Sequence, residues 1–209
     1  MTTAVDFWVD PACPWCWNTA RWVVDEVAPQ RDLEIRWQSI SLLMKNQPPE
    51  DSPYYEGTLK TLRMLRVMEA IRAAEGDAAI SDWYLLCGTR VHHDQTADFD
   101  LADALESIGL DRDYAKAADD ADTWDPIVRA GQEAGLALTG DDVGTPIIAF
   151  TGSDGERRGI FGPVISRIPT GDDALAMWDA MEAFTKVDGF WELKRTRTEG
   201  PIFPERLDY

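Results

Sequence analysis

The chain has 209 residues, of which 44% are hydrophobic and 28% are charged, a composition typical of a globular protein with a sizeable core. Its 38 acidic and 20 basic side chains give a net charge of -18 at pH 7, which disfavours nucleic acid and anionic lipid as partners. Three cysteines are too few for the disulfide framework of a small secreted fold. We see no apolar stretch approaching the roughly 18 residues of a membrane span, and no secretory signal in residues 1–10. These features predict a cytoplasmic protein.

The first forty residues follow a strand–helix–strand pattern. Residues 4–9 are rich in valine and aromatic side chains and end at Asp10-Pro11, and helical spacing of apolar residues continues from there to Pro29. Residues 33–40 alternate apolar and polar side chains, as a half-buried strand does. The chain therefore opens with a predicted βαβ unit.

The next hundred residues show helical spacing and little strand signal. Apolar residues three apart precede Gly76 and again precede Gly109, which predicts helices that end at these glycines. A further helix is expected to begin at Asp125-Pro126, with the aspartate as its cap, and to end at Gly135.

Strand signals return near the C-terminus. Residues 147–151 and 156–161 flank the glycine-containing turn 152–155 and predict a β-hairpin. Thr170 with Asp173 resembles a capping box, which would begin a closing helix.

Together these elements predict an α/β fold in the order β-α-β, helical insertion, β-β-α, with helices on both faces of a mixed sheet. A crossover must bring the chain back to the same sheet, so the insertion is expected to lie as a lid over one end of it. We assign residues 1–45 and 140–209 to the sheet domain and residues 46–139 to the inserted lid.

The strongest chemical signal is Cys13-Pro14-Trp15-Cys16, where the first strand meets the first helix. Two cysteines at this spacing can close a disulfide, and the free N–H groups and dipole of the first helical turn stabilise a thiolate on the first of them. Cys13 is therefore the candidate nucleophile, and Cys16, facing the apolar side of the helix, is the candidate resolving thiol. Such a pair in a βαβ context is typical of thioredoxin-like redox chemistry.

A zinc site is the alternative role for the pair. It needs a second pair of ligands, and the rest of the chain offers only Cys87, His92 and His93, so no metal is expected. Cys87 lies in an apolar run and is expected to be a core residue. One of the two histidines, with His92 the candidate, could contact a ligand or donate a proton from the lid; a surface or capping role is the alternative.

A second signal is Thr145-Pro146 directly before the strand at 147–151. Proline at the start of a strand cannot donate to the ladder, so a tight loop is expected, with the Thr145 backbone available to pair with an extended substrate. The residues alone leave the isomer of this bond open, and its position after the insertion favours cis.

These motifs resemble the DsbA-like branch of the thioredoxin superfamily over nearly the whole chain. A closer resemblance, to the actinobacterial mycothiol-dependent reductases (mycoredoxin-like or nitroreductase-type proteins), is carried by residues 6–17, 140–146, 161–164 and 192–199. It implies a thioredoxin-like fold in which Cys13 attacks, Cys16 resolves and Pro146 is a cis-proline facing them. It also implies a cytosolic enzyme that has no tightly bound cofactor and is reduced by mycothiol, a low-molecular-weight thiol.

The resemblance extends to thiol-binding residues. Asn46 and Tyr54 fall where that family places contacts to its thiol ligand, with Tyr55 an equal competitor, and Trp15 would wall the cleft beside Pro14. Periplasmic oxidants of the broader family carry histidine in place of Trp15. Because a histidinium would stabilise the neighbouring thiolate, we expect a higher pKa for the first cysteine here and a more reducing couple.

The sequence thus predicts a DsbA-like thiol-disulfide oxidoreductase that reduces disulfides or small electrophiles. Two alternatives stay open: a redox-switched protein-binding module without turnover, and a thiol-dependent enzyme resembling the kappa class of glutathione transferases and related isomerases. Isomerases of glutathione adducts have serine where this chain has Cys13, which disfavours that activity. Lys194, Arg195 and Arg197 could meet an anionic group or be solvated charges of the tail.

Overall fold

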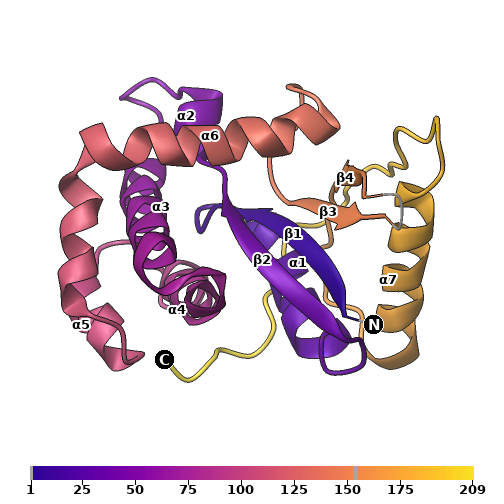
Figure 1. The fold of residues 1–209 in the computed structure, drawn as a ribbon, viewed down its shortest axis with the longest axis horizontal. Helices are drawn as coiled ribbons and strands as arrows, with labels where there is room; N and C mark the ends of the chain where they lie inside the picture. Colours follow the sequence, from indigo (N-terminus) through magenta and orange to yellow (C-terminus); the bar gives the residue numbers. More distant parts are fainter. Residues whose placement is uncertain (1, 153–154) are drawn as a thin grey trace.

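The computed structural model describes residues 2–152 and 155–209. Within them a four-stranded mixed sheet has the order β2-β1-β3-β4 (Figure 1). Strands β1 and β2 are parallel, and β3 is antiparallel to both β1 and β4. The strands are β1 (Thr3–Val9), β2 (Leu33–Ser39), β3 (Ile147–Thr151) and β4 (Arg157–Phe161). The predicted mixed sheet is confirmed.

The helices fall in the three predicted places. Helix α1 (Pro14–Trp22) and the π-helical turn η1 (Val23–Val27) connect β1 to β2, and α7 (Gly171–Thr185) follows β4. The insertion between β2 and β3 contains α2 (Leu42–Asn46), α3 (Tyr55–Glu75), η2 (Asp77–Ala79), α4 (Ile80–His92), α5 (Leu101–Ser107), η3 (Arg112–Asp119) and α6 (Ala121–Thr139). The order β-α-β, helical insertion, β-β-α is therefore confirmed.

Helices cover both faces of the sheet. Successive residues of β1 point to opposite faces, so neighbouring residues of this strand contact different helices. Phe7 belongs to the main core cluster, which includes residues of α1 and α7, whereas Trp8 belongs to a smaller cluster with Leu136 of α6. The Trp8 indole also donates to the carbonyl of Gly131 in α6 at 2.7 Å. Helix α6, the last of the insertion, thus forms the cover of the second face.

Of the other inserted helices, α3 and α4 lie beside the edge of the sheet at β2 (Figure 1). Trp37 of β2 contacts Tyr84 of α4 with ring centroids 4.9 Å apart. The hydroxyl of Ser39 donates to Glu69 of α3 at 2.6 Å. Both parts of the chain therefore share one core. The boundaries at residues 45/46 and 139/140 stay a prediction.

The predicted start of α6 at Asp125-Pro126 is wrong. The helix begins at Ala121, and its cap is Asp120, whose carboxylate accepts the N–H of Thr123 at 3.1 Å. Because this cap lies more than one turn earlier, Pro126 falls inside the helix.

The predicted end of α6 at Gly135 is also wrong, since the helix continues to Thr139 and is followed by Gly140 with φ 100°. Gly135 is instead a packing residue. A Cβ atom there would lie 2.7 Å from Nε1 of Trp8, so glycine permits the close approach of α6 to the sheet.

The capping box at α7 is wrong as well. Thr170 is the N-cap residue, but its side chain makes no capping hydrogen bond. The carboxylate of Glu26 accepts the N–H of Gly171 at 3.1 Å instead. The hairpin of β3 and β4 is confirmed, whereas residues 153–154 of its predicted turn lie outside the described residues.

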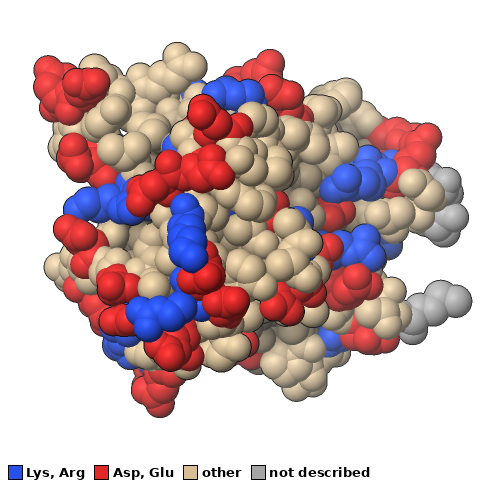
Figure 2. Space-filling view, turned by 60° about the vertical axis from the view of Figure 1, so that its left-hand side comes forward, with Lys and Arg blue, Asp and Glu red and all other residues tan. Residues whose placement is uncertain are grey.

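The acidic excess is spread over the surface. Figure 2 shows acidic side chains, with Lys and Arg among them, over the face that the inserted helices form. Exposed ion pairs such as Arg63 with Asp119 and Lys60 with Asp98 connect neighbouring elements there, and each contributes little stability. In the part of the chain described, no helix is both long and apolar enough to cross a membrane.

Gly88 of α4 generates a prediction about packing. A Cβ atom there would lie 2.2 Å from Cζ3 of the fully buried Trp17. Gly88→Ala is expected to lower the free energy of unfolding by about 1–3 kcal/mol, because overpacking outweighs the gain in helix propensity. The matched control is Gly57→Ala in α3, where an added Cβ meets nothing within 4 Å. The control should raise stability by up to about 1 kcal/mol. Urea unfolding measures both, and two stabilising substitutions would contradict the close packing.

Candidate active site

The CPWC motif begins α1, as predicted. Cys13 is the N-cap residue with extended backbone, and Pro14 is the first helical residue. The N–H of Cys16 donates to Sγ of Cys13 at 3.4 Å, so a sulfur takes the capping position that serine or aspartate oxygen usually occupies. Both cysteines are free thiols. This geometry holds the two side chains one helical turn apart.

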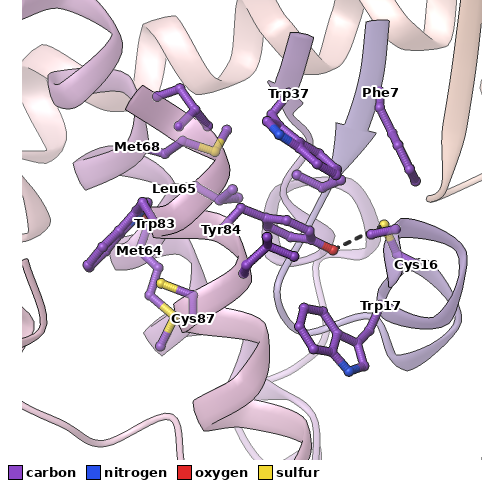
Figure 3. Packing of buried hydrophobic residues seen from close by; sticks show 14 of the residues in the cluster. Phe7, Cys16, Trp17, Trp37, Met64, Leu65, Met68, Trp83, Tyr84 and Cys87 are labelled. Carbon is purple, nitrogen blue, oxygen red and sulfur yellow. Dashed lines mark hydrogen bonds between the residues drawn. The ribbon is translucent and has the colours of Figure 1, made fainter. Parts of the chain in front are cut away.

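The sulfur of Cys16 is fully buried among hydroxyl and carbonyl groups. Its S–H donates to the Trp8 carbonyl at 3.8 Å, Oγ1 of Thr145 lies 3.2 Å away, and the Tyr84 hydroxyl donates from 3.7 Å (Figure 3). Burial raises the pKa of Cys16 far above its ordinary value, the charge of Cys13 adds to this, and the hydrogen bonds from Thr145 and Tyr84 oppose it. Cys16 is therefore held as a thiol in this state.

Cys13 is 6% exposed. Burial raises the pKa of its thiol to about 11, and the carboxylate of Asp10 adds to the rise. The backbone N–H groups of Cys16 and Trp15 and the charge of Arg197 act in the opposite direction. Burial is thus the largest cause of the raised pKa of Cys13.

The loop before β3 faces the motif. The Thr145–Pro146 peptide bond is cis, and the Thr145 carbonyl accepts the thiol of Cys13 at 3.5 Å. A second cis bond precedes Pro163, whose carbonyl accepts the hydroxyl of Thr19 in α1 at 2.7 Å. Two loops of the C-terminal half are thus hydrogen-bonded to the motif and its helix.

Asp10 is a site residue that sequence reasoning missed. Its fully buried carboxylate accepts the N–H of Ala12 at 2.8 Å and of Leu42 at 2.7 Å, which joins the motif loop to the start of α2. Burial raises its pKa to about 6. The sequence showed an aspartate-proline pair at the end of a strand; its place three residues before Cys13 is the signal that could have found it.

Tyr84 is the second residue that sequence reasoning missed. It belongs to the apolar run 83–87, which predicts only core packing, and it is 1% exposed. Its ring enters the site from α4 beside Trp37 and Trp17 (Figure 3). The one signal in the sequence is that Tyr84 carries the only hydroxyl of this run.

The C-terminal tail also reaches the motif. The guanidinium of Arg197 lies 5.1 Å from the ring centroid of Trp15, within cation–π range, and its charge lowers the pKa of Cys13. All three tail cations named in the sequence, Lys194, Arg195 and Arg197, are exposed.

The remaining predicted contacts lie elsewhere. The ring of His92 stacks on Trp17 at 5.8 Å and donates to the Pro11 carbonyl, and burial lowers its pKa to about 4, so it is neutral at pH 7. Asn46 is exposed at the end of α2, and Tyr54 is 74% exposed. Among the described residues, the hydrogen-bond partners of the two motif sulfurs include none of these three. Their part in thiol binding stays a prediction.

Cys87 is fully buried in the main core, as predicted (Figure 3). His93, the residue after α4, accepts the indole N–H of Trp17 at 3.3 Å, so it supports α1. Within residues 2–152 and 155–209, no three His, Cys, Asp or Glu side chains are grouped to hold a metal ion.

Comparisons with known proteins show what the chain and its fold are similar to. The chain is similar to the uncharacterized protein Rv2286c of Mycobacterium tuberculosis, with 27% identity over 203 residues that cover 96% of this chain and 85% of the relative. It is similar to the cytosolic disulfide reductase DsbM from Pseudomonas aeruginosa, solved with GSH, at a TM-score of 0.58 and 13% identity over 86% and 99% of the two chains. It is also similar to a 2-hydroxychromene-2-carboxylate isomerase, at a TM-score of 0.53 and 17% identity over 86% and 94%.

These structural likenesses confirm the predicted thioredoxin-like fold of the DsbA type. The family model described as Rv2466c-like, mycothiol-dependent nitroreductase Rv2466c, matches residues 12–195. Because this match spans most of the chain and includes both motif cysteines, the protein belongs to the Rv2466c-like family of mycothiol-dependent nitroreductases.

Proposed function

We propose that this enzyme is a thiol-disulfide oxidoreductase in which Cys13 and Cys16 cycle between dithiol and disulfide, with mycothiol as the reducing co-substrate. The supporting observation is the contact of Cys13 Sγ with both the Cys16 N–H and the Thr145 carbonyl. These contacts place the first sulfur at the helix start, against the cis-proline loop, with the second sulfur one turn behind it. Such a thiol pair can attack a disulfide and then expel the partner.

The cycle balances in two halves. The Cys13 thiolate attacks one sulfur of a substrate disulfide, forms a mixed disulfide and releases the other half as a thiolate, which takes up a proton. Cys16 then attacks Sγ of Cys13, closes the intramolecular disulfide and releases the second thiol. Two molecules of mycothiol return the enzyme to the dithiol and leave as mycothiol disulfide. Substrates are therefore disulfides, or small electrophiles that accept the same two electrons.

The surroundings of Cys13 favour the reducing direction. Its thiolate has no histidinium beside it, and burial and Asp10 raise its pKa. The dithiol form therefore gains little from ionisation, and a couple of this kind is a reductant. Because a thiol co-substrate that keeps both cysteines reduced implies a reducing compartment, we place the reaction in the cytoplasm.

Several residues are proposed to hold the bound thiol. Trp15, which is half-buried, and the Thr145–Pro146 loop flank Cys13 and would contact the thiol beside Pro14. Asn46 and Tyr54 are proposed from the sequence resemblance alone, and His92 from its expected place in the inserted lid.

Cysteine substitutions test the cycle. Cys13→Ser is expected to abolish mycothiol-dependent reduction of a model disulfide, because the attacking sulfur is gone. Cys16→Ser should stop at the mixed disulfide, which intact-mass spectrometry detects as one added thiol. Cys87→Ala, which keeps both motif thiols, is the control and should retain turnover. Turnover that survives in Cys13→Ser would refute the mechanism, and wild-type protein that forms its disulfide without turnover would favour the binding-module alternative.

The reduction potential tests the direction. We expect one reversible two-electron transition near the roughly -270 mV of thioredoxin rather than the roughly -120 mV of a strong oxidant. Tryptophan fluorescence can follow it, since Trp15 lies between the two cysteines and Trp17 directly follows Cys16. The Cys16→Ser variant should show no such transition. A wild-type potential at the oxidant end would mean that the enzyme forms disulfides.

Substitution of Asp10 tests the electrostatics. The carboxylate, with a pKa of about 6, is charged wherever Cys13 titrates, and its charge raises the pKa of that thiol. Asp10→Asn is therefore expected to lower the pKa of Cys13, which moves the pH profile of alkylation by iodoacetamide to lower pH. Asp6→Asn, in β1 and paired with Arg157, is the control and should leave the profile unmoved. An unchanged or raised pKa in Asp10→Asn would show that its charge does not reach the sulfur.

A further inference from the structure

Tyr84 approaches Cys16 from the insertion in a fixed orientation. Its hydroxyl lies 3.7 Å from Sγ of Cys16 (Figure 3), and both side chains are buried, at 1% and 0% exposure. The ring packs against Trp37 of β2 at 4.9 Å and against the edge of Trp17 in α1 at 6.2 Å. Aromatic rings on both sides therefore hold the phenol against the sulfur.

A neutral thiol is a poor partner for this hydroxyl. A buried tyrosine hydroxyl usually has a strong hydrogen-bond partner, and the partner here is the sulfur of Cys16, which is a weak acceptor as a thiol. Hydrogen bonds to an ionised group are roughly twice as strong as neutral ones. Burial and the charge of Cys16 raise the pKa of Tyr84 well above its ordinary value, so the phenol keeps its proton. Tyr84 therefore gains most when Cys16 is a thiolate.

Thr145 can also turn its hydrogen bond toward Cys16 when this sulfur loses its proton. Its Oγ1 lies 2.9 Å from the Trp8 carbonyl and 3.2 Å from Sγ of Cys16, and a hydroxyl has one hydrogen to donate. While Cys16 keeps its proton, Thr145 can donate to the carbonyl. When the proton leaves, Thr145 can donate to the sulfur beside Tyr84. Two hydroxyls are thus placed to stabilise a buried thiolate. Among the described residues, the interactions that lower the pKa of Cys16 are hydrogen bonds and include no cation.

We propose that Tyr84 is a catalytic residue of the resolving step, in which its hydroxyl stabilises the thiolate of Cys16 as this sulfur attacks the mixed disulfide on Cys13. A bond forms between the two motif sulfurs, and the bond from Cys13 to the outgoing sulfur breaks. The outgoing sulfur takes the electron pair, and the proton that Cys16 gave up goes to this sulfur or, where the leaving thiol is acidic, to water. This inference rests on the proposed function and assigns part of its chemistry to the inserted helix α4.

A single-turnover experiment separates the two steps. Reduced enzyme is mixed with a nitrobenzoate disulfide whose released thiolate absorbs visible light. Attack by Cys13 releases the first equivalent and resolution by Cys16 releases the second. In Tyr84→Phe, which keeps the ring, the first phase should stay within about twofold of wild type. The second should slow by about 10- to 100-fold, as expected for the loss of one hydrogen bond to an ionised group.

The pH dependence of the second phase distinguishes catalysis from packing. Loss of the donor raises the pKa of Cys16, so the second phase of Tyr84→Phe should shift to higher pH. Asp10 is the other titrating group that acts on Tyr84 in this phase, because Cys13 is held in the mixed disulfide, and Asp10 remains in the variant. The matched control is Tyr114→Phe, which removes an exposed hydroxyl bonded to Glu75 and should alter neither phase.

Each outcome has one meaning. A slow second phase with a persistent mixed disulfide in the mass spectrum supports the role of Tyr84. Equal second phases in wild type and Tyr84→Phe would overturn it and leave the proposed function intact. Both phases slowed alike, with an unshifted pH profile, would also overturn it, because only packing would have changed. Wild-type enzyme that releases a single equivalent would contradict the proposed function itself.

Discussion

The site depends on the complete burial of one sulfur atom by three distant segments. Sγ of Cys16 is enclosed by the end of β1 at Trp8, by the loop before β3 at Thr145 and by α4 at Tyr84. These contacts join residues that lie 8, 129 and 68 positions from Cys16 in the chain. The environment of the resolving thiol therefore exists only when the sheet and the insertion have both folded. The contacts that join these parts of the fold are also the contacts that surround the reacting sulfur.

Burial also acts on the sulfur of Cys13, where it opposes the interactions that favour a thiolate. The first turn of α1 offers N–H groups that favour a thiolate on Cys13, while desolvation and the carboxylate of Asp10 disfavour it. Asp10 cannot be treated as an electrostatic residue alone, because it accepts hydrogen bonds from Ala12 and Leu42. The same carboxylate that raises the pKa of the nucleophile thus ties the motif loop to the insertion. Charge in the site and attachment of α2 are two consequences of one side chain.

Local sequence patterns predict those features of the structure that local interactions decide. The strands, the CPWC motif at a helix start and the burial of Cys87 follow from periodicity and spacing, and all are found in the structure. The predictions that α6 ends at Gly135 and that a capping box begins α7 at Thr170 were wrong because distant groups decide both features. The indole of Trp8 requires glycine inside α6, and a carboxylate from η1 takes the place of the threonine cap. Asp10 and Tyr84 have only weak signals in the sequence, because their contacts with Leu42 and Cys16 depend on distant segments.

The placement of Tyr84 follows from a glycine on its own helix. Tyr84 and Gly88 are four residues apart in α4, so they lie on the same face, and they contact consecutive residues of α1. Tyr84 meets Cys16, and Gly88 lies against the indole of Trp17. Because an ordinary side chain at Gly88 would collide with that indole, glycine is what allows α4 to lie close enough for the phenol to reach the sulfur. The close packing of α4 on α1 and the hydrogen bond to the resolving thiol are therefore one arrangement, in which a missing Cβ atom determines the distance of a hydroxyl from the sulfur.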